Sequence, residues 1–254
     1  MAKRVLLGML TPSSNTVLEP VTSAMVSSLP EVSAHFGRFR VTEISLQQQA
    51  LQQFDNKPLI DAAQLLADAK VDAIAWNGTS AGWLGFEADV QLCQQITDVT
   101  GIPATTSVLA LLEILRDCAK RSAQSDRQIT KFGLVTPYLP DVQERIIVNF
   151  AEAGFHCIAE QHLNLSVNFT FSEVTPDKLT SMIHSVAAQQ PQAILTFCTN
   201  LRAAPLVAEL EKELGIPIYD TVTAAVWKSL CIAGVDSSRI EGWGSLFSHS
   251  FGKE

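Results

Sequence analysis

The sequence predicts an α/β protein of two pseudo-symmetric lobes, each a mostly parallel four-stranded sheet flanked by helices, with an active site in the cleft between them. Two observations predict this fold class. Short apolar runs alternate with longer stretches of helical periodicity, which is typical of βα units. Three segments of the first half also recur in the second half in the same order, displaced by about 120 residues.

The repeat matches residues 8–12 with 133–137, 71–80 with 191–200, and 100–103 with 214–217. A single match between two α/β units carries little information, whereas three in register favour duplication. We therefore assign residues 1–118 to the first lobe and 119–254 to the second, with a polar linker at about 119–127. The sequence leaves open whether the C-terminal segment, about 222–254, packs back on the first lobe.

The predicted elements follow the alternation of patterns along the chain. Strands are predicted at residues 5–10, 71–76, 102–105, 131–135, 193–197 and 216–219, and more weakly at 35–44 and 155–165. Helices are predicted at about 15–29, 57–69, 84–99, 107–121, 140–153, 176–189, 203–214 and 222–233.

Composition narrows the class of partner. Apolar residues make up 47% of the 254 residues, yet no apolar run is long enough to cross a bilayer, so no membrane partner is expected. The net charge of −8, without a basic tract, argues against nucleic acid. Five cysteines, without disulfide or zinc spacing, indicate reduced thiols in the cytoplasm. The sequence leaves a homo-oligomer open.

Motifs for several common chemistries are absent from the sequence. No Gly-x-Gly-x-x-Gly follows a strand, there is no Walker-type loop, and there is no Gly-x-Ser-x-Gly elbow. The five histidines are scattered without the spacing of metal ligands. We therefore predict neither a cofactor nor a metal.

The loop after the first strand, residues 11–16, is rich in hydrogen-bonding groups. Ligands of open parallel sheets bind beyond the carboxyl ends of the strands. Ser14 and Asn15, with free N–H groups at a helix N-terminus, suit a carboxylate. The alternative is that Ser13 or Ser14 caps the helix, with Pro12 at its start.

The corresponding loops after two later strands carry the candidate reactive groups. Cys198 ends a strand, and a thiol beside a helix N-terminus can have a lowered pKa and serve as an acid or a nucleophile. Gly78, Thr79 and Ser80 hold the equivalent place in the first half, where N–H and hydroxyl groups could stabilise an oxyanion. The alternatives are a buried small hydrophobe at 198 and a tight turn at 78.

Aromatic residues stand near these loops. Tyr138 follows the second Thr-Pro pair and could donate a phenol hydrogen bond, or only pack. Trp76 and Trp83 flank Gly78 and could line the cleft, although tryptophan beside a strand end is more often core.

These residues, taken together, resemble the aspartate/glutamate racemase superfamily in its maleate isomerase and arylmalonate decarboxylase branch. Residues 11–16 and 197–202 resemble maleate isomerase motifs, and residues 77–80, 135–142 and 214–217 resemble the decarboxylase. The resemblance covers nearly the whole chain. It implies two lobes with a cofactor-independent site between them.

The resemblance also assigns roles to residues. Racemases and maleate isomerases of the superfamily carry one cysteine per lobe, and here Gly78 fills the first-lobe place. The decarboxylase has the same glycine and cysteine, so the resemblance implies decarboxylation of a substituted malonate with Cys198 as the proton donor. Thr79, Ser80, Tyr138 and the N–H of Thr199 would hold the enediolate.

The first loop resembles the isomerases instead. Asn15 matches one of their carboxylate-binding asparagines, and Asn168 is aligned with a second. We therefore expect a small dicarboxylate substrate more polar than an arylmalonate. An isomerase or racemase that works with one thiol, and a dicarboxylate-binding protein without turnover, remain alternatives.

Overall fold

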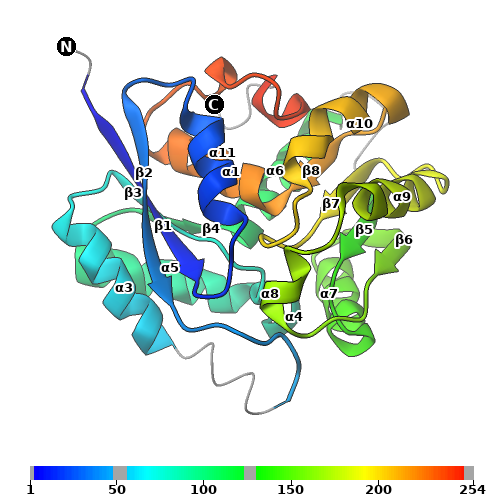
Figure 1. Cartoon of the computed structure of the whole chain (residues 1–254), viewed down its shortest axis with the longest axis horizontal. Coiled ribbons are helices and arrows are strands. Elements are labelled where there is room, and N and C mark those ends of the chain that lie inside the picture. Colours follow the sequence, from blue (N-terminus) through cyan, green and yellow to red (C-terminus); the bar gives the residue numbers. More distant parts are fainter. Residues whose placement is uncertain (1–2, 48–55, 123–129, 249–254) are drawn as a thin grey trace.

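The computed structural model describes residues 3–47, 56–122 and 130–248, and it consists of two four-stranded parallel sheets flanked by helices (Figure 1). The strand orders are β2-β1-β3-β4 and β6-β5-β7-β8, so the two sheets have the same topology. The predicted fold class is confirmed. The matched segments around Gly8 and Gly133 form the corresponding strands β1 and β5.

Each sheet has its first strand near the middle, where both faces are covered. This is why β1 and β5 are almost wholly apolar. The strands are β1 Val5–Pro12, β2 Val32–Phe39, β3 Ala73–Trp76, β4 Ala104–Thr106, β5 Lys131–Thr136, β6 His156–His162, β7 Ala193–Thr196 and β8 Ile218–Asp220.

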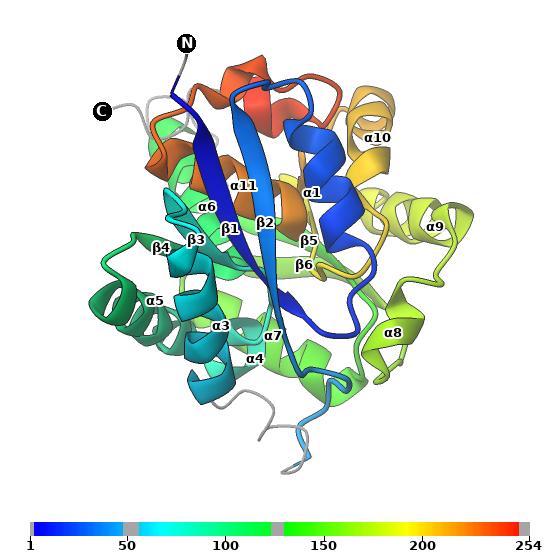
Figure 2. The same ribbon diagram turned by 60° about the vertical axis from the view of Figure 1, so that its left-hand side comes forward.

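Helices cover both faces of each sheet. In the first lobe, α3 and α5 pack together on one side, and α1 and α11 pack on the other (Figure 2). In the second lobe, α7 contacts β6, and α9 contacts β5, β6 and α10. The helices are α1 Leu18–Val26, α3 Asn56–Asp68, α4 Ala81–Leu84, α5 Phe86–Thr100, α6 Ser107–Ser122, α7 Pro140–Glu152, α8 Asn168–Phe171, α9 Pro176–Ala187, α10 Val207–Leu214 and α11 Thr221–Ile232, with 3₁₀ turns η2 Ala204–Leu206, η3 Ser237–Arg239 and η4 Ser245–Ser248.

Helix α11 joins the two halves. It follows β8 of the second sheet, but it packs against α6, β3 and α1. Its residues are buried nearly all round the helix, as expected of a helix enclosed by protein on every side. One hydrophobic cluster consequently runs through both sheets, so the strand ends of the two lobes are held in a fixed relation.

Several predicted boundaries are wrong for local reasons. The helix predicted over 84–99 is α5, which begins only at Phe86 because Gly85, with a φ of 102°, separates it from the short helix α4. The first helix begins at Leu18 rather than near residue 15, and Pro12 belongs to β1 rather than to a helix start. The predicted linker at 119–127 is helical to Ser122, and its remainder lies outside the described residues.

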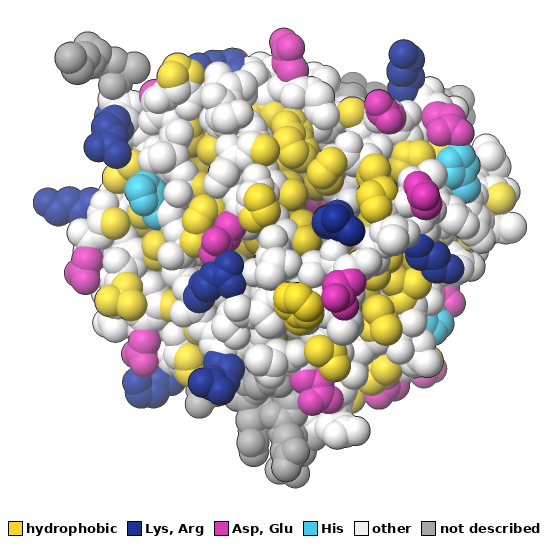
Figure 3. All heavy atoms as spheres, in the orientation of Figure 1, with side chains coloured by type: hydrophobic (Ala, Val, Ile, Leu, Met, Phe, Trp, Pro, Cys, Tyr) yellow, Lys and Arg dark blue, Asp and Glu magenta, His cyan; other side chains and the backbone are white. Residues whose placement is uncertain are grey.

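The surface carries charges of both signs. On the face shown in Figure 3, lysine and arginine side chains lie singly among acidic ones. No helix in residues 3–47, 56–122 or 130–248 combines the length and apolar character needed to span a membrane.

Candidate active site

A pocket lies where the carboxyl ends of the central strands of both lobes meet. Its volume is about 290 Å³, counting the space that opens to solvent. Residues after β3, β5 and β7 contribute to it, together with the end of β1, so the predicted loops surround one pocket. The lining residues are Pro12, Val41, Ile44, Trp76, Gly78, Thr79, Ser80, Trp83, Tyr138, Asn168, Cys198 and Thr199.

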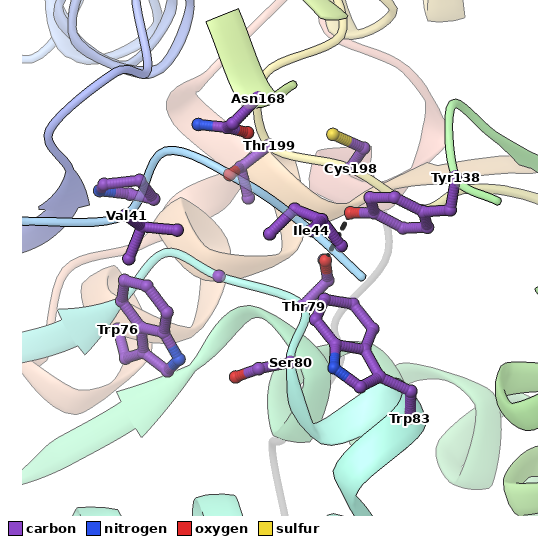
Figure 4. Close-up of a pocket in the computed structure, with 12 residues that line it drawn as sticks. Val41, Ile44, Trp76, Thr79, Ser80, Trp83, Tyr138, Asn168, Cys198 and Thr199 are labelled. Atoms are coloured by element: carbon purple, nitrogen blue, oxygen red, sulfur yellow. Dashed lines mark hydrogen bonds between the residues drawn. The ribbon is translucent and has the colours of Figure 1, made fainter. Parts of the chain in front are cut away.

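A chain of hydrogen-bonding groups crosses the pocket from the first lobe to the second. The Thr79 hydroxyl and the Tyr138 hydroxyl are 2.6 Å apart (Figure 4), and Tyr138 lies close enough to the Cys198 thiol to lower the pKa of Cys198. Burial, followed by the neighbouring Cys198, raises the pKa of Tyr138 well above its usual value. The phenol is therefore held neutral, as a hydrogen-bond donor.

Cys198 is a protonated thiol in this environment. The residue is only 2% exposed, and this burial raises its pKa to about 12. The hydrogen bond with Tyr138 and the N–H groups of Asn200 and Leu201 lower the pKa in part, whereas the charge of Asp220 raises it. The thiol is thus well suited to give a proton and poorly suited to act as a ready thiolate.

The expectation of a lowered pKa at Cys198 is wrong. It assumed that a helix begins directly after the strand, so that the helix dipole would stabilise the thiolate. In the structure, a turn follows Cys198, a 3₁₀ segment begins at Ala204, and α10 begins only at Val207. The dipole effect is confined to the first turn of a helix, so burial determines the pKa instead.

Asp220 is a buried carboxyl group behind Cys198 that the sequence reasoning missed. Its Oδ1 caps α11 by accepting the Val222 N–H at 2.7 Å, and its Oδ2 accepts the Thr196 hydroxyl at 2.7 Å. Burial raises the pKa of Asp220 to about 6. The available signal was an aspartate between a short strand and a helix, which is a capping position.

The first-lobe wall opposite Cys198 contains no thiol and no room for one. A Cβ added at Gly78 would lie 2.0 Å from Cζ2 of Trp76, far closer than any real contact. Trp76 is itself 1% exposed and packs on Phe39, with ring centroids 4.9 Å apart. Gly78 is therefore required by the indole that covers it, and not by a turn with a positive φ, which its backbone does not adopt.

Both tryptophans line the pocket while remaining buried. Trp83 packs edge-on against Tyr138, with ring centroids 5.4 Å apart, and so supports the phenol. Trp76 and Val41 lie at the end of the pocket away from Tyr138 and Cys198 (Figure 4). The two alternatives considered for these residues, cleft and core, both apply.

Ser14 and Asn15 are placed behind the pocket rather than in its lining. The Asn15 amide donates to the carbonyl oxygen and the hydroxyl of Thr199, at 3.1 and 3.2 Å. Its Oδ1 accepts the N–H groups of Val17 and Leu18, just where α1 begins. The N-cap of α1 is Val17, so neither Ser13 nor Ser14 caps the helix.

Ser14 instead connects two strand-end loops. Its hydroxyl donates to the Val41 carbonyl at 2.6 Å and accepts from the Asn168 amide at 2.8 Å. A β-bridge between Glu43 and Val167 adds to this cross-lobe connection. Ser14 and Asn15 therefore position Asn168 and Thr199, the residues that do face the pocket.

The pocket lining carries no charged side chain. Among the described residues, the Ser80 hydroxyl has no hydrogen-bond partner, and the backbone N–H groups of Thr79, Ser80 and Thr199 donate to no protein acceptor. These neutral donors form the polar part of the lining, whereas Pro12, Val41 and Trp76 form an apolar wall. The site suits one carboxylate joined to an apolar group.

The other four cysteines do not line the pocket, and none of the five, all of which lie in the described residues, forms a disulfide. In the described part of the chain, no group of three or more His, Cys, Asp or Glu side chains is arranged to hold a metal ion.

Comparison with known proteins places this site in a family. The arylmalonate decarboxylase family model matches residues 9–247. The chain belongs to that family. A maleate isomerase of Geobacillus stearothermophilus is 24% identical over 241 residues, covering 91% of this chain and 92% of the relative. An arylmalonate decarboxylase of Bordetella bronchiseptica is 24% identical over 249 residues, covering 96% and 97%.

The fold is shared with solved structures of the family's enzymes. A mutant maleate cis-trans isomerase of Nocardia farcinica, with a covalently bound succinylcysteine intermediate, superposes with a TM-score of 0.83. It is 23% identical, and the match covers 96% of this chain and 98% of that one. The family therefore includes both decarboxylases and isomerases, at similar distance from this chain.

Proposed function

We propose that this protein is a cofactor-independent decarboxylase of a substituted malonate, with Cys198 as the proton donor. One observation carries the proposal: a protonated thiol stands on one wall of the pocket, and the opposite wall has Gly78 with its side-chain space occupied by Trp76. Such a site can deliver a proton to one face of a carbanion. It offers no acid or base to the other face.

The reaction balances with the residues present. The bond between the α-carbon and one carboxylate breaks, carbon dioxide leaves, and the electron pair remains on the α-carbon and the other carboxylate as an enediolate. Thr79, Ser80, Tyr138 and the N–H of Thr199 hydrogen bond that enediolate. Cys198 then transfers its proton to the α-carbon, and the resulting thiolate recovers a proton from water.

The polarity of the pocket supports this reaction. The carboxylate that is retained meets hydrogen-bond donors, whereas the one that is lost would lie against the apolar side chain of Ile44, which lines the pocket near Thr79 and Tyr138 (Figure 4). A carboxylate is poorly solvated there, and its loss as neutral carbon dioxide relieves that cost. The apolar wall also changes our expectation of a polar substrate, because Asn15 does not reach the pocket.

Maleate isomerisation is the second candidate, supported by full-length isomerase relatives. An isomerase that works through a cysteine adduct needs a thiolate to attack the double bond. A thiol whose pKa is raised to about 12 provides very little thiolate at neutral pH. Racemisation needs a second acid or base on the first-lobe wall, where Gly78 offers none.

The proposal is tested by measuring the turnover of a small panel of candidate substrates. The protein is incubated with α-substituted malonates, maleate, and D- and L-aspartate, while carbon dioxide, fumarate and optical rotation are followed. We expect carbon dioxide from a malonate and, in heavy water, deuterium on one face of the product. Conversion of maleate to fumarate would support the isomerase, and binding without turnover would support a binding protein.

A further inference from the structure

Trp76 occupies the end of the pocket that the side group of a substrate would enter. Its indole covers Gly78 and is fixed from behind by Phe39. At the other end lie Cys198, Thr79 and Tyr138, which must contact the reacting carboxylates (Figure 4). A substrate held by those groups extends its α-substituent toward Trp76 and Val41.

The indole cannot yield to a larger group without a free-energy cost. Trp76 is 1% exposed, it ends β3, and its backbone pairs with Thr106 of β4. A side chain so fully buried and packed on Phe39 cannot change rotamer without disturbing its neighbours. The space left beside it is therefore fixed in length.

We propose that Trp76 determines substrate specificity by limiting the length of the α-substituent. This inference rests on the proposed function for the substrate class, a 2-alkylmalonate. Trp83, the other pocket tryptophan, supports Tyr138 at the opposite end and does not set this length. In an apolar pocket, one methylene changes recognition by roughly 10- to 200-fold, so a shortened side chain at 76 has a measurable effect.

The experiment measures binding separately from turnover. The dissociation constants of methyl-, ethyl-, propyl- and butylmalonate are determined by calorimetry for Cys198→Ala, and again with Trp76→Leu added. We expect affinity to fall with chain length for Cys198→Ala. With Trp76→Leu, the ratio of butyl to methyl affinity rises about tenfold or more. Trp76→Phe, a milder change, shifts it in the same direction and covers the case in which the leucine variant does not fold.

Trp83→Leu is the matched control, and it should leave the order of affinities along the series unchanged. Unchanged order in both Trp76 variants overturns the inference, and so does an equal shift in Trp83→Leu. A shifted order, combined with no carbon dioxide from the enzyme that retains Cys198, supports the inference and overturns the proposed reaction. If none of the malonates binds either variant, the substrate class fails and the inference fails with it.

Discussion

The loops after β3 and β7, one in each lobe, occupy the same place in the fold but place their large and small side chains at opposite positions. In the first lobe, β3 ends in Trp76 and the residue two positions on is Gly78. In the second lobe, β7 ends in the smaller Thr196 and the residue two positions on is Cys198. The first-lobe loop therefore combines a large side chain with a glycine, and the second-lobe loop combines a small side chain with a thiol.

This difference between the lobes explains how a duplicated fold can have a reactive group on one wall of its pocket only. Thr196 turns its hydroxyl to Asp220 and leaves room for the thiol, whereas Trp76 takes the corresponding room in the first lobe. The chemistry at each loop is set by the strand-end residue as much as by the residue at position 78 or 198. Four experiments test this difference between the lobes and the buried groups around it.

Removal of the Cys198 thiol should have the largest effect. General acid catalysis contributes roughly 10²- to 10⁴-fold, so we expect Cys198→Ala to lower kcat for a malonate by about 10³-fold. Since the pKa of Cys198 is raised to about 12, the thiol stays protonated as pH rises, and its ionisation should not appear in the rate profile between pH 6 and 9.

Cys93→Ala is the control for Cys198→Ala, because Cys93 lies on α5 away from the pocket. It should retain the rate of the unaltered protein. Full activity in Cys198→Ala would show that another group delivers the proton.

Loss of the hydrogen bond between Thr79 and Tyr138 should have the second-largest effect on kcat. Tyr138→Phe removes a donor that faces Cys198, and an oxyanion donor is typically worth about 10²- to 10³-fold in kcat. Thr79→Val keeps the shape and removes the hydroxyl partner. Because the two hydroxyls share one hydrogen bond, the double variant should lose less than the product of the single losses. Fully multiplicative losses would mean that the residues act independently.

Each lobe also contains a buried carboxyl group, Asp220 in the second lobe and Asp89 in the first, and Asp89 should make the stability of the fold depend on pH. Burial raises the pKa of Asp89 to about 7, and its hydrogen bond with Thr106 lowers it only in part. The folded state therefore binds this proton more tightly than the unfolded state. The stability it contributes is present below about pH 4 and is lost as pH rises through about 7.

We expect Asp89→Asn to be more stable than the unaltered protein at pH 8, by up to about 4 kcal/mol, and to differ little at pH 4. Urea unfolding at the two pH values measures this. Asp61→Asn, at an exposed position on α3, is the control and should leave the dependence on pH unchanged. An unchanged pH dependence in Asp89→Asn would place the titrating group elsewhere.

The smallest effect is expected from a side chain at Gly78. Gly78→Cys places a Cβ against the Trp76 indole, and overpacking costs about 1–3 kcal/mol. In a Trp76→Thr background, which copies the second-lobe pattern, the same substitution should cost less. Urea unfolding of the four proteins gives the coupling free energy between the positions. Additive costs would show that Trp76 does not exclude a side chain at 78.

Much of the fold was predictable because it depends on local pattern. The alternation of apolar runs predicted six of the eight strands plainly, and the weak pattern at 35–44 and 155–165 reflects the edge strands β2 and β6, whose residues are largely half-buried. The short helix α4 was missed because its four residues are too few to show a helical period.

The site was predictable in part. The strand-end rule brought Gly78, Thr79, Ser80, Tyr138, Cys198 and Thr199 to one pocket. It could not distinguish lining residues from those behind them, as Ser14 and Asn15 show. Asp220 was missed because its burial beside Cys198 depends on α11 crossing to the other lobe.

Residue order and local periodicity were enough to predict the duplicated α/β topology, the single thiol after a strand and the glycine at the matching place. Three features became visible only in the folded chain: Trp76 covers Gly78, burial keeps the Cys198 thiol protonated, and Asn15 supports the pocket from behind. These outcomes depend on contacts between distant segments, which no local pattern records.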